Sequence, residues 1–184
     1  MKSSPLFAAL SLMTLIALPG AAMAATACSL LSSQDAATLA GVALPENFKA
    51  ETPPTRENGN DHTTVCGWFP KGYNLATAAG APEAGVQLTV HDMKTPAEAK
   101  TFHTHSAEMT REIAKSGPLA GKISAPAGLG DNAVLDVKTL QGNAQVATLQ
   151  FFKGSAALQI QAWSKGPGAG EVATKAAKQV AGKL

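Results

Sequence analysis

The stretch QVATLQFFKGSAALQIQAW, residues 145–163, decides the fold. Apolar and polar side chains alternate through much of it, which predicts two half-buried strands. Lys153-Gly154-Ser155 between them predicts a tight hairpin. The buried face is expected to carry Leu149, Phe151, Leu158 and Ile160, and the outward face Gln150, Gln159 and Gln161.

Other short β-type runs lie at residues 65–69, 86–90 and 133–137. The clearest is 86–90, where Val86, Leu88 and Val90 alternate with Gln87 and Thr89. The polar stretch 51–63 and the Ala/Gly/Pro-rich stretch 73–85 predict loops. We therefore expect a mainly antiparallel sheet of about five strands.

A long helix is expected between residues 95 and 116. Thr95, Pro96 and Glu98 form a capping box with proline at the first helical position. Large apolar residues then recur at helical spacing, together with Ala99 and Ser106. This stripe, which we expect to pack on a sheet containing Val86, Leu88, Leu149 and Ile160, consists of Phe102, Met109 and Ile113.

Two shorter helices complete the pattern. Ser32 and Asp35 form a capping box before residues 34–39, and Gly41 suits the helix end. The final helix is expected to place Val172, Ala176, Val180 and Leu184 inside. The sequence thus predicts an α+β fold, with a long central helix and a C-terminal helix packed on the sheet.

The N-terminus has the features of an export signal. Lys2, an apolar run over residues 6–18 and Ala22-Met23-Ala24 predict a signal peptide over residues 1–24, cleaved after Ala24. The rest, residues 25–184, has the length of a single α+β domain. No later stretch reaches the roughly 20 apolar residues of a membrane span, so we expect no integral membrane segment after cleavage. The expected location is the periplasm or the cell exterior.

The chain has two cysteines, Cys28 and Cys66. In an oxidising compartment the simplest outcome for such a pair is one disulfide. The alternative is lipidation of Cys28, because Ala25-Thr26-Ala27 loosely matches a lipoprotein cleavage site. That alternative would leave Cys66 as a lone thiol.

Charge and histidine spacing argue against two classes of ligand. The formal net charge is +2, and no Lys/Arg cluster is present, so we expect no nucleic-acid partner. His103 and His105 are expected to point to opposite sides of the long helix, both toward solvent, because two residues there turn by about 200°. We therefore predict no metal site and no cofactor. A site at His91 and Met93 joined by one helix histidine stays open, since such ligands suit copper.

No catalytic motif is complete. GPGAG, residues 166–170, lacks the third glycine of a dinucleotide-binding turn, because Glu171 stands there. GLGDN, residues 128–132, has the composition of an ordinary turn. No G-x-S-x-G or H-E-x-x-H occurs. We therefore predict no catalytic residues and no enzyme, with an enzyme of dispersed site as an alternative.

The order of these segments resembles a known group of proteins. The chain begins with Cys28-Ser-Leu-Leu and a capped helix ending in Gly41, and then has Cys66-Gly67-Trp68 and a long helix. These are followed by Gly-Leu-Gly-Asp, a hairpin and a final helix ending in Leu184. This resembles small exported domains, often lipoproteins, whose fold is similar to the PsbP-like α/β sandwich. The resemblance implies that fold and the cysteine pairing, and it implies no catalytic residue.

The sequence favours a non-enzymatic exported binding module. A specific version is an inhibitor or immunity-type protein that acts on an envelope protein. We expect Trp68 in the core and Trp163 at a sheet edge, and either is a candidate contact residue for a partner. The alternatives are a periplasmic carrier of a metal or small ligand, using His91, Met93 and one helix histidine, and the dispersed-site enzyme. The oligomeric state is not predicted.

Overall fold

The structure is a computed structural model, and it describes residues 27–53, 61–74, 77–78, 80–116, 121–130 and 132–184. The predicted signal peptide lies outside these residues, as do parts of the two predicted loops. The helices are η1 (Ala27–Leu30), α2 (Ser33–Ala40), α3 (Pro96–Ser116), η2 (Gln141–Asn143) and α4 (Ala169–Lys183). The strands are β1 (Glu46–Thr52), β2 (His62–Trp68), β3 (Ala84–Asp92), β4 (Lys122–Ser124), β5 (Val134–Thr139), β6 (Gln145–Lys153) and β7 (Ala156–Ser164).

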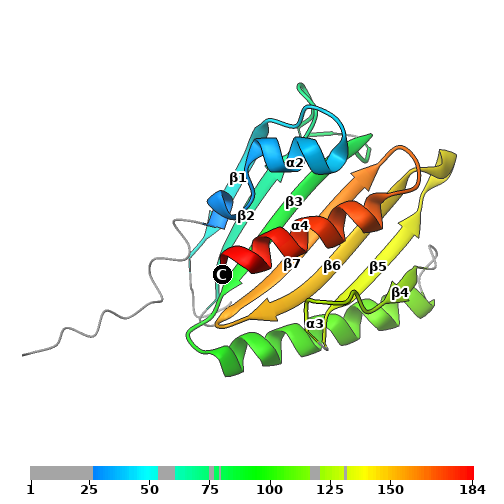
Figure 1. Cartoon of the computed structure of the whole chain (residues 1–184). Helices are drawn as coiled ribbons and strands as arrows, with labels where there is room; N and C mark the ends of the chain where they lie inside the picture. The colour runs from blue at the N-terminus through cyan, green and yellow to red at the C-terminus, as the bar shows by residue number, and fades with distance from the viewer. Residues whose placement is uncertain (1–26, 54–60, 75–76, 79, 117–120, 131) are drawn as a thin grey trace, which may run out of the picture.

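The seven strands of the described residues form one antiparallel sheet in the order β1-β2-β3-β7-β6-β5-β4. The predicted hairpin is present, because Lys153 pairs with Ala156 and Gly154 has a positive φ of 57°. Strand β3 then pairs with β7, which joins the N-terminal and C-terminal halves of the sheet (Figure 1). The helix α3 connects β3 to β4.

The expected count of about five strands is too low. The two missed strands, β1 and β4, are the edges of the sheet. All three residues of β4 are exposed, and β1 has six exposed residues and one half-buried one. Neither edge strand therefore has the alternation of buried and exposed side chains from which a strand is recognised in sequence.

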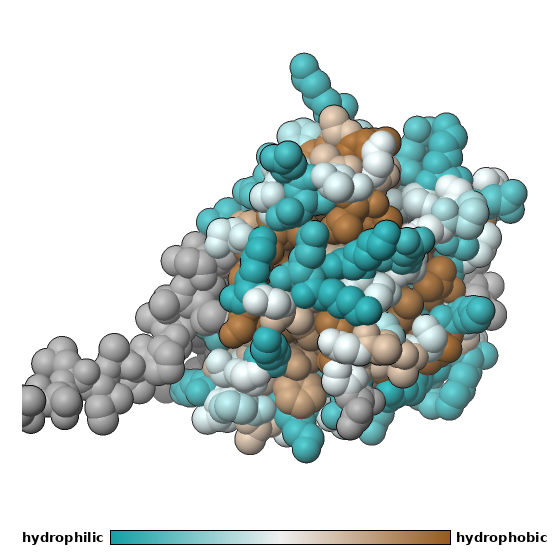
Figure 2. All heavy atoms as spheres, viewed as in Figure 1, coloured by the Kyte–Doolittle hydropathy of each residue, from teal (hydrophilic) through white to brown (hydrophobic). Residues whose placement is uncertain are grey.

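The hydrophobic core lies on one face of the sheet. Leu88, Leu149 and Ile160, from the three central strands, are fully buried there. Helices α2 and α4 cover this face (Figure 1). Helix α4 contributes a row of small residues and Val180, which agrees with the predicted inner face. Seen from the same side, hydrophilic and hydrophobic side chains are interspersed over these helices (Figure 2).

The short helix α2 begins and ends as its sequence predicts. The Ser32 hydroxyl accepts a hydrogen bond from the Asp35 amide, and the Asp35 carboxylate accepts one from the Ser32 amide. Gly41 at its C-terminal end has a φ of 70°. The helix therefore has both of its terminal caps.

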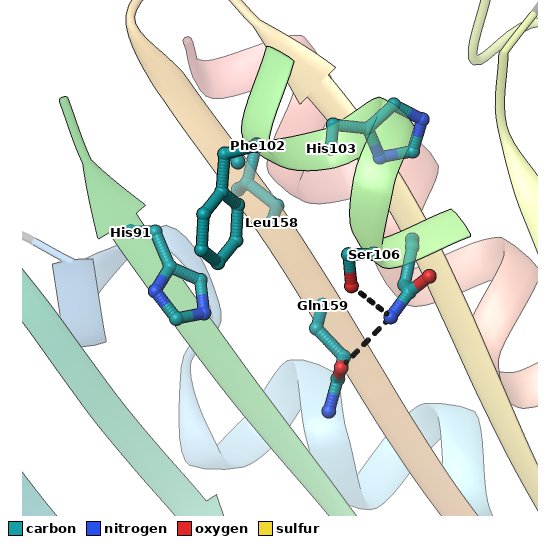
Figure 3. A pocket seen from close by; sticks show the side chains of 8 residues that line it. His91, Phe102, His103, Ser106, Leu158 and Gln159 are labelled. Carbon is teal, nitrogen blue, oxygen red and sulfur yellow. Dashed lines mark hydrogen bonds between the residues drawn. The ribbon is translucent and has the colours of Figure 1, made fainter. Parts of the chain in front are cut away.

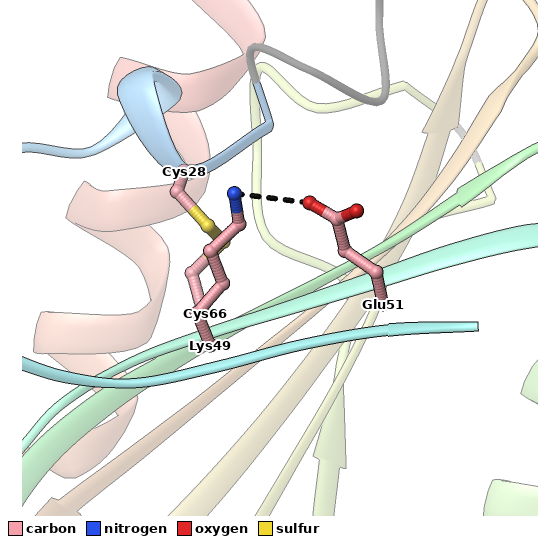
Figure 4. The surroundings of a disulfide bond; sticks show 4 residues. All are labelled: Cys28, Lys49, Glu51 and Cys66. Carbon is pink, nitrogen blue, oxygen red and sulfur yellow. Dashed lines mark ion pairs between the residues drawn. A yellow bond between two sulfur atoms is a disulfide. The ribbon is translucent and has the colours of Figure 1, made fainter.

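A disulfide joins Cys28 of η1 to Cys66 of β2, with Cα atoms 5.5 Å apart (Figure 4). Cys66 is fully buried in the core. Its neighbour across the strand pair is Lys49, whose Nζ lies 2.9 Å from Glu51 Oε1. The disulfide therefore fixes the N-terminal segment against the sheet near an edge strand.

The predicted orientation of the long helix is wrong. Met109 and Ile113 are 52% and 50% exposed and point away from the sheet, while Phe102 is 36% exposed and touches His91 at the end of β3. Ala99 of the predicted face is buried, and Ser106 contacts Gln150; the other buried residues of α3 are His103, Ala107 and Ala114.

The helix also lies on the other face of the sheet from α4. Ser106 and Thr110 form hydrogen bonds with Gln150, which alternates with the core residues Leu149 and Phe151. Gln150 thus points away from the core as predicted, but α3 covers it and leaves it 6% exposed. The small side chains of α3 allow the helix to lie close to this polar surface, and that contact determines which side of the helix is buried.

The second tryptophan also differs from its expected place. Trp68 is fully buried, as expected for a core residue. Trp163 was expected at a sheet edge, but β7 is an inner strand and Trp163 is only 9% exposed. Its ring lies 5.6 Å from that of Phe69. It therefore belongs to a small aromatic cluster and is not an exposed anchor.

The disulfide closes a loop with a sequence separation of 38 residues. Removing it with Cys28→Ser/Cys66→Ser should lower the free energy of unfolding by about 4 kcal/mol, because the unfolded chain regains loop freedom. Urea unfolding of the oxidised wild-type protein and of the double variant measures this difference. A difference below about 1 kcal/mol, or two free thiols in the unreduced exported protein, would contradict the expectation.

Candidate functional site

The most distinctive surface of the protein is the solvent-facing side of α3. Five large apolar side chains are exposed among the described residues, and three of them, Phe102, Met109 and Ile113, lie along this helix. At about 100° per residue the three fall within about 40° of each other on the helix surface. We call this row the α3 stripe. Isolated exposed apolar residues are ordinary, but a row of three on one helix indicates a contact surface.

The stripe ends in a hollow at the N-terminal end of the helix. This open hollow has a volume of about 440 Å³ and is lined by Met93, Ala97, Glu98, Thr101 and Phe102. Apolar side chains provide most of its wall, and one carboxylate lies at its border. It has room for a large apolar side chain of a partner.

The acidic and basic residues of α3 lie on different sides of the stripe. Glu98, His105 and Glu112 follow one another at seven-residue spacing, about 40–80° from the stripe on the solvent side. All three are exposed. Lys100 and Arg111 lie on the opposite side of the helix, about 160–180° from the stripe. The border of the stripe that faces solvent is therefore acidic.

A cluster of polar residues lies where β2 begins and β3 ends. Asp61 Oδ2 accepts a hydrogen bond of 2.9 Å from the Thr63 hydroxyl and lies 2.7 Å from His91 Nδ1. A carboxylate only accepts, so Nδ1 carries the proton and the ring is held in one orientation. The His91 ring also packs on Phe102, with ring centres 4.5 Å apart.

The carboxylates of this group are unusually buried. Asp61 and Asp92 are 9% and 7% exposed, and the Oδ1 atom of each has no hydrogen-bond partner among the described residues. Burial raises the pKa of Asp92, and the nearby negative charge of Asp61 adds to this, while His62 and Ser155 oppose it. The ionised form of Asp92 is therefore held in the fold at a cost.

A small pocket lies between His91, Phe102 and the polar residues beneath α3 (Figure 3). Gln150 donates hydrogen bonds from Nε2 to Ser106 Oγ at 2.9 Å and to Gln159 Oε1 at 3.1 Å. The free volume is about 10 Å³, which holds no more than a water molecule. The Asp61–His91 pair resembles half of a catalytic triad, but this pocket has no room for a substrate.

The structure separates the histidines that the sequence singled out. His103 was expected to face solvent, but it is 2% exposed and its Nε2 lies 2.7 Å from the carbonyl oxygen of Asn132. Burial lowers the pKa of His103, which favours the neutral form of its ring. His105 is exposed on the other side of α3, as the angular argument predicts. Met93 is buried, and His91 is paired with Asp61.

These positions do not form a shared ligand set. Across the described residues there is no group of three or more His, Cys, Asp or Glu side chains that could hold a metal ion. The glycine segments have structural places: Gly168 is the N-cap of α4, and Gly128 and Gly130 have positive φ angles of 85° and 90° in a turn. The aliphatic chain of Lys178 lies over Gly128.

Two features of this surface were missed from the sequence. The Asp61–His91 contact joins residues 30 positions apart, so only the register of β2 and β3 reveals it. Asp61 also fell inside the predicted loop 51–63. The exposed stripe used residues that the sequence did single out, but their exposure depends on which side of α3 meets the sheet.

Comparison with known proteins gives a structural likeness. No protein-family model matches the chain, and no curated protein does. The chain is similar to a solved structure, the extracellular domain of PknH from Mycobacterium tuberculosis, with a TM-score of 0.64. The two are 11% identical over 86% of this chain and 94% of that chain. The likeness supports the α+β fold, and the PsbP-like resemblance stays a prediction.

A helix that crosses a membrane must be both long and apolar. Within the described residues, no helix has both the length and the apolar character needed to span a membrane.

Two carboxylates should give opposite pH effects on stability. Asp92 has a raised pKa, so its ionisation costs stability as pH rises above its ordinary value of 3.8. Asp92→Asn should therefore raise the melting temperature at pH 7, with the gain disappearing near pH 3. The Ser32 hydrogen bonds lower the pKa of Asp35, so Asp35→Asn should lower the melting temperature at pH 7.

The Asp35 loss should also shrink as pH falls, because the stabilising charge is protonated in acid. Thermal unfolding of the wild type and both variants between pH 3 and 7 measures the two slopes. A destabilised Asp92→Asn variant at pH 7 would show that the ionised carboxylate stabilises the fold, contrary to this account.

Proposed function

We propose that the chain is a non-enzymatic exported binding module that docks an envelope protein through the α3 stripe. The observation that carries this proposal is the exposure of Phe102, Met109 and Ile113 in one row beside a hollow of about 440 Å³. A few anchor residues in well-packed pockets supply most of the binding energy in protein interfaces, and Phe and Met are enriched in such interfaces. An inhibitor or immunity-type protein would use such a surface to cover its target.

Export is supported by three further observations. The Cys28–Cys66 disulfide suits an oxidising compartment, and residues 1–24 have the pattern of a signal peptide. The similar solved structure is described as an extracellular domain. These observations favour action outside the cytoplasm.

The surface favours protein docking over the two alternatives. A carrier needs an enclosed site, yet the pocket beside His91 has a volume of about 10 Å³. An enzyme needs a nucleophile or general base facing a substrate-sized space. The Asp61–His91 pair is the best such group among the described residues, and its histidine lines that same small pocket. The large hollow is apolar and open, as a protein contact requires.

Co-purification from envelope extract after mild cross-linking tests the proposal. The wild-type protein should retain one stoichiometric protein partner, and Met109→Gln/Ile113→Gln should lose it because two apolar anchors are removed. Glutamine keeps helix propensity, and both positions are exposed, so folding should be unchanged. The matched control is Lys100→Gln/Thr104→Gln, which alters exposed positions on the other side of α3.

The control should retain the partner at the wild-type level. Retention of the same partner by Met109→Gln/Ile113→Gln would show that docking uses another surface. Recovery of no stoichiometric partner by the wild type would count against the binding-module proposal itself.

A further inference from the structure

We infer that the partner segment docked on the α3 stripe is a cationic amphipathic helix, with apolar anchors on one side and Lys or Arg beside them. This inference rests on the proposed function and adds the chemistry of the partner. Three features that lie together on α3 support this inference: the exposed apolar stripe, the hollow at its N-terminal end and the acidic border beside it.

The apolar part of the surface has the dimensions of a helix contact. Residues 102 and 113 are 11 positions apart, which is about 16 Å along the helix axis. The hollow extends the apolar surface past Phe102 to Met93 and Ala97. An amphipathic helix presents anchors at three- and four-residue spacing over this length, and such helices commonly bind apolar grooves.

The charges beside the stripe select a cationic partner. Glu98 lines the hollow, and Glu112 follows it on the same side of α3 two heptads later. The Lys115 side chain lies 2.9 Å from Glu112, but both side chains are more than 70% exposed. Such exposed pairs are weak, so a partner cation can replace Lys115 at little cost. The other two cations of α3, Lys100 and Arg111, lie on the other side of the helix.

Charge also disfavours two other occupants. A second copy docked stripe to stripe about a two-fold axis would place the Glu98–Glu112 border against the same border of its partner. An anionic lipid surface would meet the same carboxylates. A cationic helix meets complementary charge at both ends of the stripe.

The probes are two labelled 18-residue synthetic helices with identical leucine positions. One carries lysine on its polar side, and the other carries glutamate at the same positions. Fluorescence anisotropy with the full exported protein should show binding of the lysine helix, at least about tenfold tighter than the glutamate helix, and weakened by salt.

The variants separate the apolar and charged contributions. Glu98→Gln/Glu112→Gln should weaken the lysine helix about fivefold, and glutamine at position 98 can keep the capping box with Thr95. Met109→Gln/Ile113→Gln should weaken both helices at least about tenfold. The matched control Lys100→Gln/Arg111→Gln should stay within about twofold of the wild type.

Equal binding of both helices, lost in Met109→Gln/Ile113→Gln, would overturn the inferred charge class while leaving the docking surface intact. Failure of the lysine helix to bind would also overturn this inference, and the extract experiment would then judge the proposed function separately. A stripe-dependent dimer in sedimentation velocity, or stripe-dependent binding to anionic vesicles, would show a different occupant and overturn it too.

Discussion

The structure depends on one constraint: the sheet has a single strongly apolar face, and helices must cover it. Strands β3, β6 and β7 place fully buried leucine and isoleucine side chains on that face, against the small residues and Val180 of α4. Burial of this apolar area is the main stabilising contribution in a fold of this size. The disulfide joins η1 to the same core. Everything on the other face is consequently free to be polar.

That freedom explains the position of α3. Its packing surface is built from Gln150, Ser106, Thr110 and a buried histidine instead of a large apolar cluster. Small alanines bring the helix close enough for these hydrogen bonds. The large apolar residues of α3 are then left on its solvent side, where a partner can reach them. The proposed docking surface thus follows from how the fold divides its polar and apolar residues.

Particular elements show what sequence patterns can predict here. The β6–β7 hairpin, the α2 capping box and the inner face of α4 follow from local periodicity and capping chemistry, and they were predicted. The edges β1 and β4 were missed because their residues are mostly exposed. The predicted inner side of α3 was wrong because two rows of residues on this helix have helical spacing. One row has large apolar side chains and the other has mainly alanines, and hydrophobicity alone favours the row with the larger side chains. Likewise, Asp61 meets His91 only through strand register.

The most direct test of the account is the oxidation rate of two methionines. Met109 is 52% exposed on the α3 stripe, whereas Met93 is 8% exposed. Dilute hydrogen peroxide followed by peptide mass mapping of the folded protein measures both rates in one sample. The account predicts that Met109 is oxidised much faster than Met93, and that both react alike after unfolding. Protection of Met109 to the level of Met93 would mean that the stripe faces the sheet, and would contradict the account.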